Sequence, residues 1–169
     1  MKKLIIGSVL IIAVLMLSGL ATPVSAGVEP SPFRDINVLN SMVNELGSVE
    51  RRTGFILAHP PDPVKPGLIG DLNRLDAMGD DLERLDNRLG GLIGTHPINS
   101  QDLPEDVIAA YGDVKAGAQG IVDDINAYLR DPTGGNPSND FDEALIGLRS
   151  SAQQIITTIN TYLIGQILS

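Results

Sequence analysis

The chain has 169 residues, a formal net charge of −9 and no cysteine. An acidic surface repels phosphate, which argues against binding to nucleic acid or to anionic lipid. Because cysteine is absent, the chain can form no disulfide and can attach no haem covalently. Aromatic residues on which nucleic-acid bases could stack are few: three Phe, three Tyr and no Trp.

The first 26 residues predict a cleaved signal peptide. Two lysines at positions 2 and 3 precede an apolar run over residues 4–17, and the small residues Val24-Ser25-Ala26 follow. Positive charge, apolar run and small-residue cleavage site, in that order, are typical of a secretory signal. We therefore expect a secreted, periplasmic or cell-surface protein whose mature domain is 27–169. The alternative is an uncleaved membrane anchor.

The mature part divides into four predicted helices. Segments rich in Pro, Gly and Asn at 59–67, 94–101 and 131–138 predict loops. Between them, over 35–58, 68–92, 103–130 and 140–168, apolar residues recur three and four positions apart, as on one helix face. The predicted core positions, in chain order, are Leu39, Met42, Leu46, Val49, Thr53, Ile56; Leu68, Leu72, Leu75, Met78, Leu82, Leu85, Leu89, Leu92; Val107, Tyr111, Val114, Ala118, Ile121, Ile125, Tyr128; and Phe141, Leu145, Leu148, Ala152, Ile155, Ile159, Tyr162.

Four helices of similar length with loops of about eight to ten residues predict an all-α fold, an antiparallel up-down-up-down four-helix bundle forming one domain. Two alternatives are a long hairpin that dimerises into a bundle and a three-helix core with one helix displaced. At the helix ends, Asp140 fits a capping position, and Gly90 with Gly91 fits a C-terminal cap. Asp80 and Arg84, four residues apart, predict a surface ion pair.

Small residues occur near the midpoint of every predicted helix. We expect them to share one layer, because antiparallel helices of equal length place their midpoints at one level. The layer is either a waist where backbones approach closely, with Leu46 and Met78 filling the space, or a central cavity for an apolar ligand. The residues are Gly47, Gly79, Gly117, Ala118, Ser151 and Ala152.

The histidines and methionines do not predict a haem site. His59 and His96 each precede a proline in a loop, and the second helix separates them, so both are expected to be solvated and not to ligate one iron. Met42 and Met78 lie well inside their helices. Glu-x-x-His, which di-iron bundles use, does not occur in the sequence.

The acidic residues do not predict a metal site either. The segment 131–142 resembles a calcium loop but has Asn136 in place of the glycine and lacks the final glutamate. No predicted helix carries a histidine that could activate a serine. We predict no catalytic, cofactor or metal site, and we expect a solvated face at Asp76, Asp80, Asp81, Glu83 and Asp86.

The functional hypothesis is therefore a non-catalytic interaction or structural module that binds a protein partner or a second copy. Arg149 is the last charged residue, and at 100° per residue Ile164 and Leu168 project off the core stripe of the last helix. An uncharged face with exposed aliphatics suits an interface, since interface cores are depleted of charge. The alternatives are a carrier or sensor of a small apolar ligand in the bundle core and an enzyme without a recognisable site.

Overall fold

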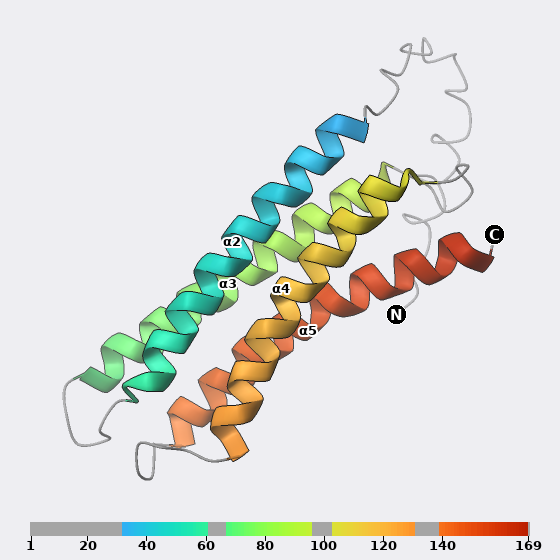
Figure 1. Ribbon diagram of the computed structural model, residues 1–169. Helices are drawn as coiled ribbons and strands as arrows, with labels where there is room; N and C mark the ends of the chain where they lie inside the picture. Colours follow the sequence, from blue (N-terminus) through green and yellow to red (C-terminus); the bar gives the residue numbers. More distant parts are fainter. Residues whose placement is uncertain (1–31, 61–66, 96–102, 131–138, 169) are drawn as a thin grey trace, which may run out of the picture.

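The computed structural model describes residues 32–60, 67–95, 103–130 and 139–168. All regular secondary structure in these ranges is helical: α2 spans Pro32–Ala58, α3 Gly67–Gly94, α4 Glu105–Arg130 and α5 Asn139–Leu168. The prediction of an all-α fold with four packed helices is confirmed (Figure 1). The signal segment with its cleavage site, and residues 131–138 of the calcium-like loop, lie outside the described residues.

The helix ends differ from the prediction by up to three residues. The expected cap at Gly90 and Gly91 is wrong, because α3 continues to Gly94 while Leu92 and Ile93 pack against the core. Beyond Gly94 the helix is closed by Thr95, whose backbone N–H and hydroxyl both donate to the Leu92 carbonyl, at 3.1 and 2.6 Å.

The fourth helix also begins earlier than predicted. Because α5 starts at Asn139, Asp140 lies in its first turn and not at the capping position. A carboxylate in the first turn still interacts favourably with the positive end of the helix dipole. The third helix begins later, at Glu105, and the Pro104 carbonyl accepts its first hydrogen bonds, from Val107 at 3.0 Å and Ile108 at 3.1 Å.

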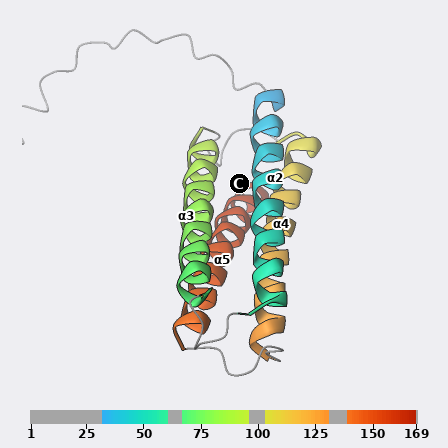
Figure 2. The same ribbon diagram turned by 90° about the vertical axis from the view of Figure 1, so that its left-hand side faces the viewer.

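The helices alternate in direction along the chain, but their neighbours are not those of a simple up-down-up-down bundle. The most extensive contacts join α2 to α4 and α3 to α5, and each of these pairs is parallel (Figures 1 and 2). The antiparallel contact between α4 and α5 joins the two pairs, whereas α2 and α3 touch at far fewer places. Around the bundle the order is therefore α2, α4, α5, α3, and the α2–α3 side is the loosest.

The core follows the predicted stripes closely. Every predicted core residue is buried except Leu68, Leu72 and Leu92, which are half-buried toward the ends of α3. Aromatic pairs lie toward the two ends of the α4–α5 interface: the rings of Tyr111 and Tyr162 are 5.3 Å apart, and those of Tyr128 and Phe141 are 6.0 Å apart.

Glycine lets α2 and α4 approach closely. A Cβ atom at Gly117 would lie 3.2 Å from the Leu46 Cβ, and a Cβ at Gly120 would collide with the Glu50 carboxylate. Ala118, beside Gly117, is fully buried. This is the close approach predicted for a waist, and it lies between α2 and α4.

The other midpoint glycines do not take part in that approach. A Cβ at Gly47 would meet only the Arg51 guanidinium of its own helix, at 3.7 Å, and a Cβ at Gly79 would meet nothing within 4 Å among the described residues. Gly79 instead lines a groove of about 290 Å³ between α3 and α5, together with Gly147 and Ser151. The close-packed layer therefore belongs to the α2–α4 side of the bundle.

Candidate binding surfaces

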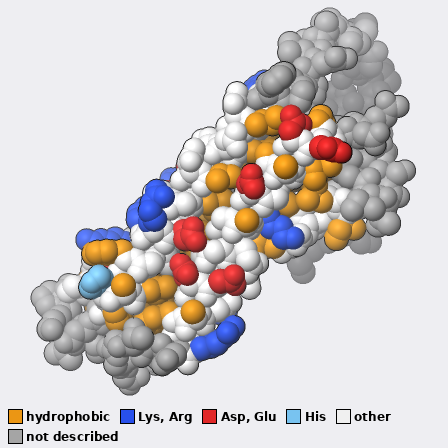
Figure 3. All heavy atoms as spheres, viewed as in Figure 1, with side chains coloured by type: hydrophobic (Ala, Val, Ile, Leu, Met, Phe, Trp, Pro, Cys, Tyr) orange, Lys and Arg blue, Asp and Glu red, His pale blue; other side chains and the backbone are white. Residues whose placement is uncertain are grey.

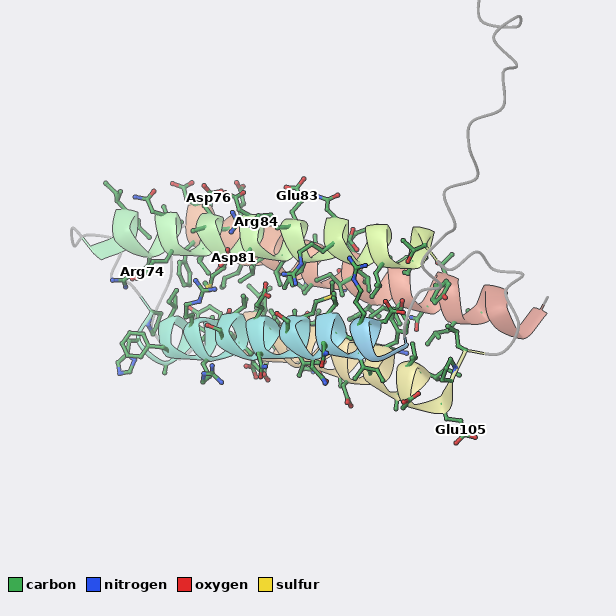
Figure 4. The ribbon with its side chains drawn as sticks, turned by 90° about the horizontal axis from the view of Figure 1, so that it is seen from above. Arg74, Asp76, Asp81, Glu83, Arg84 and Glu105 are labelled. Carbon is green, nitrogen blue, oxygen red and sulfur yellow. The ribbon has the colours of Figure 1, made fainter. Side chains whose placement is uncertain are left out.

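The acidic residues of α3 divide into an exposed set and a paired set. Asp76, Asp80 and Glu83 are exposed, as predicted, and Figure 4 shows Asp76 and Glu83 pointing away from α2. Asp81 is partly buried toward α2, and Asp86 accepts a hydrogen bond from Thr158 of α5 at 2.8 Å. Within the described ranges, no group of three or more side chains is placed to hold a metal ion.

Asp81 is the centre of an ion-pair network, whereas the sequence predicts one ion pair, between Arg84 and the neighbouring Asp80. Arg84 pairs with Asp81 and not with Asp80, so the predicted pair is wrong by one residue. Arg52 of α2 donates to the same carboxylate at 2.8 Å. The Arg52 hydrogen bond holds the pKa of Asp81 below its ordinary value, and Arg84 adds to this against the opposing effect of partial burial. Because Asp81 lies between two arginines, Arg84 pairs with Asp81 and not with the exposed Asp80.

His59 lies where the sequence placed it, exposed just after α2. Its Nδ1 is 3.1 Å from the Phe55 carbonyl oxygen, and its ring lies 5.0 Å from the Phe55 ring. The other histidine, His96, lies outside the described residues. Met42 and Met78 are buried inside α2 and α3 as predicted.

The outer face of α5 carries an uncharged stripe. Its six residues recur three and four positions apart, all are exposed, and at 100° per residue they fall within an arc of roughly 80° over about 27 Å. Aliphatic side chains stand at both ends, 42% exposed at Ile146 and 55% at Ile164. The neutral stripe comprises Ile146, Ser150, Gln153, Thr157, Thr161 and Ile164.

Two hydroxyl groups of the neutral stripe are already hydrogen-bonded within α5. Ser150 donates to the Ile146 carbonyl and Thr157 to the Gln153 carbonyl, each at 2.9 Å. Because these donors are satisfied by the helix itself, covering the stripe leaves fewer unpaired polar groups. The exposure of Ile164 follows the prediction, whereas the side chain of Leu168 lies outside those that the structure describes.

A second surface is the groove between α2 and α3. The two helices run side by side with side chains of both reaching into the space between them (Figure 4). Ion pairs cross the groove from Arg52 to Asp81 and from Arg88 to Glu45, both at 2.8 Å. The groove contains a hollow of about 450 Å³ beside Arg51 and a hollow of about 580 Å³ beside Arg34 and Arg88.

The sequence pattern does not predict this groove. Its arginines come from two helices, and only their tertiary register brings them together. The adjacent pair Arg51-Arg52 and the i, i+4 pair of Arg84 and Arg88 are the available sequence signals. Neither pattern says that α2 and α3 face each other across a gap.

Surface hydrophobic residues are also found away from α5. Figure 3 shows acidic side chains spread along one face, with hydrophobic side chains reaching the surface toward each end of it. One of these places adjoins His59, where Phe55 is 63% exposed.

Among the described residues, no helix has the length and apolar character needed to cross a membrane.

Two tyrosine hydroxyls are buried among apolar side chains. The oxygens of Tyr111 and Tyr128 have no hydrogen-bond partner within the described part of the chain. Burial raises the pKa of Tyr111 above its ordinary value, with Tyr162 and Asp35 contributing, and burial raises the pKa of Tyr128 in the same way. Both residues contribute to the core of the α4–α5 interface and are not exposed to a substrate.

Comparison of the chain with protein-family models, with curated proteins and with solved structures finds no match. The neutral stripe and the groove between α2 and α3 are the candidate binding surfaces of the described chain.

Proposed function

We propose that the protein is an exported, non-catalytic interaction or structural module that associates with a second copy or a protein partner through the neutral stripe of α5. The observation that carries the proposal is the stripe itself: six exposed uncharged residues in a chain with a net charge of −9. Charge depletion is characteristic of the centre of protein interfaces. Ile164, and Leu168 one turn further along α5, would supply apolar contacts.

The size of the stripe indicates weak association. A strip about 27 Å long and about 10 Å wide presents roughly 300 Å², less than the ~800 Å² per partner of a standard interface. Association is therefore expected only at high protein concentration, unless further surface joins the contact.

The packing of the described core favours this module over a carrier with its ligand inside the bundle. Leu46 packs on Gly117, and Ala118 and Ala152 are fully buried at the predicted middle layer. Space of ligand size is found instead at the surface, in the grooves between helices. On α3, the exposed Asp76, Asp80 and Glu83 and the ion-paired Asp81 likewise support a non-catalytic role, as does the solvated His59.

Sedimentation analysis over a wide range of concentration tests the proposal. The wild-type mass should rise with concentration, whereas the double variant Ile164→Lys/Leu168→Lys should remain monomeric, because a buried lysine in the interface leaves its charge uncompensated. The matched control is Ile108→Lys, on an exposed residue of α4, which should associate like the wild type. Circular dichroism should show equal helicity in all three proteins. A wild type that stays monomeric throughout would refute self-association.

A further inference from the structure

Arginine is concentrated along the α2–α3 groove of this otherwise acidic protein. Three arginines line its 450 Å³ hollow, Arg51 and Arg52 from α2 and Arg74 from α3, and no carboxylate belongs to the described lining of this hollow. Figure 4 shows Arg74 on the side of α3 that faces α2. The charged side chains that line the hollow are therefore all cationic, in a chain with a net charge of −9.

The three arginines differ in how far they are already engaged. Arg52 is held by Asp81 at 2.8 Å, and Arg74 is paired with Asp71 at 2.9 Å. Arg51 has no ion-pair partner in the described ranges, and its guanidinium lies over Gly47 on the same helix. A guanidinium has five N–H donors, so an arginine bonded to one carboxylate keeps donors for another anion. Arg51 is the most available cation, and Asp81 holds Arg52 in position.

The rest of the hollow is apolar. Ile56 and Met78 are buried at its base, and the exposed Phe55 ring stands at its edge. A large aromatic side chain left in water is unfavourable, and covering it contributes hydrophobic free energy. The hollow thus combines an apolar surface with cations from both α2 and α3, and its volume is near the lower end of the ~300–1,000 Å³ of small-molecule sites.

We propose that this hollow binds a small amphipathic carboxylate, an organic acid with a short aliphatic or aromatic body. The carboxylate is held by Arg51, which has no ion-pair partner in the described ranges, since arginine binds carboxylates through paired, charge-assisted hydrogen bonds. Arg74 adds positive charge at the same hollow. The apolar body lies on Ile56 and Met78 and covers Phe55. This site is separate from the neutral stripe, because residues of α2 and α3 line the hollow and the stripe lies on the outer face of α5.

Calorimetric titration of the protein, purified after expression of the full chain, tests the site with octanoate. Acetate supplies the headgroup alone, and 1-octanol supplies the body alone. Octanoate should bind with one-to-one stoichiometry, and both controls should bind at least about tenfold more weakly, since each lacks one set of contacts. Equal affinity for octanoate and either control would overturn the proposal, as would no octanoate binding at millimolar concentration.

Matched variants locate the site. Arg51→Gln/Arg74→Gln should weaken octanoate binding by about tenfold or more, the effect of losing charge-assisted hydrogen bonds. Arg130→Gln removes an exposed arginine at the C-terminal end of α4 that does not line the hollow and should change the affinity by less than about twofold. Phe55→Ser should also weaken binding while leaving the arginines in place. Equal losses in Arg51→Gln/Arg74→Gln and Arg130→Gln would show non-specific attraction and overturn the proposal.

The same titration separates this inference from the proposed function. The Ile164→Lys/Leu168→Lys variant should bind octanoate with the wild-type affinity, because its substitutions lie on α5. Chemical-shift changes in nitrogen–proton spectra should centre on Ser48, Phe55 and Ala77 at the hollow. Shift changes centred on α5 would assign the binding to the neutral stripe and contradict this site.

Discussion

The buried tyrosines show how one polar atom can cost stability in an otherwise apolar core. Tyr111 is completely buried, packs against Tyr162, and its hydroxyl has no hydrogen-bond partner within the described residues. A buried donor without a partner loses its hydrogen bonds to water and gains none in exchange, a cost of about 1–3 kcal/mol. The ring is valuable for packing, whereas the hydroxyl is not.

Replacing Tyr111 with phenylalanine should therefore leave the protein as stable as the wild type or up to about 1 kcal/mol more stable near pH 7. The folded-state pKa is raised by burial, so the ionisation of Tyr111 does not reduce the stability of the wild type below the unfolded pKa of about 10. Above about pH 10 the unfolded chain loses this proton first, and the wild type should lose about 1.4 kcal/mol per pH unit that the variant does not lose.

Urea unfolding of both proteins across this pH range measures the difference, and the Tyr128 contribution cancels because both proteins retain it. Tyrosinate absorbance should show that Tyr111 ionises only as the wild type unfolds. A variant clearly less stable than the wild type near pH 7 would mean that the hydroxyl makes a stabilising hydrogen bond.

At the scale of helices, the α2–α4 contact determines the arrangement of the bundle. Gly117 allows α4 to lie close against Leu46 of α2. The α2–α3 side has ion pairs across a groove in place of close packing. The parallel neighbours α2 and α4 therefore pack tightly, while α2 and α3, which follow each other in the chain, stay apart.

The substitution Ala118→Leu tests the close approach. Ala118 is fully buried next to Gly117, so the added volume must displace its neighbours, at a cost of about 1–3 kcal/mol from overpacking. The matched control is Ala116→Leu on the exposed side of the same helix, where the change should stay within about 0.5 kcal/mol. Thermal and urea unfolding measure both variants. A neutral or stabilising Ala118→Leu would indicate an internal cavity at this level.

The helices and their buried faces could be predicted because the signal is local. Spacings of three and four residues identify the stripe from Leu39 to Ile56, and even place Thr53 in the core, because helix geometry alone sets which side chains share a face. The choice of Asp81 over Asp80 as partner of Arg84 could not be predicted in the same way. It depends on Arg52, which approaches from another helix.

At the scale of the whole molecule, the order of the helices around the bundle could not be predicted from the sequence. The alternation in direction follows from helices of similar length, but the neighbours of α2 are chosen by contacts such as Leu46 with Gly117, which join residues far apart in the sequence. The same limit applies to the candidate sites. Helix geometry predicted that Ile164 is exposed, whereas the hollow beside Arg51 requires the position of α3 relative to α2.

Both proposed surfaces would act outside the cytoplasm, so the processing of the N-terminus is the final prediction. Signal cleavage after Ala26 removes Lys2 and Lys3 and no acidic residue, which leaves ten basic and 21 acidic side chains and a net charge of −11. Small residues at Val24 and Ala26 suit signal peptidase, so N-terminal sequencing of the exported protein should begin at Gly27. Ala26→Lys should block processing, because the cleavage site requires a small residue there. If the wild type is recovered from membranes with Met1 or Lys2 still present, the segment is an anchor, and the neutral stripe then works at a membrane surface on a tethered protein.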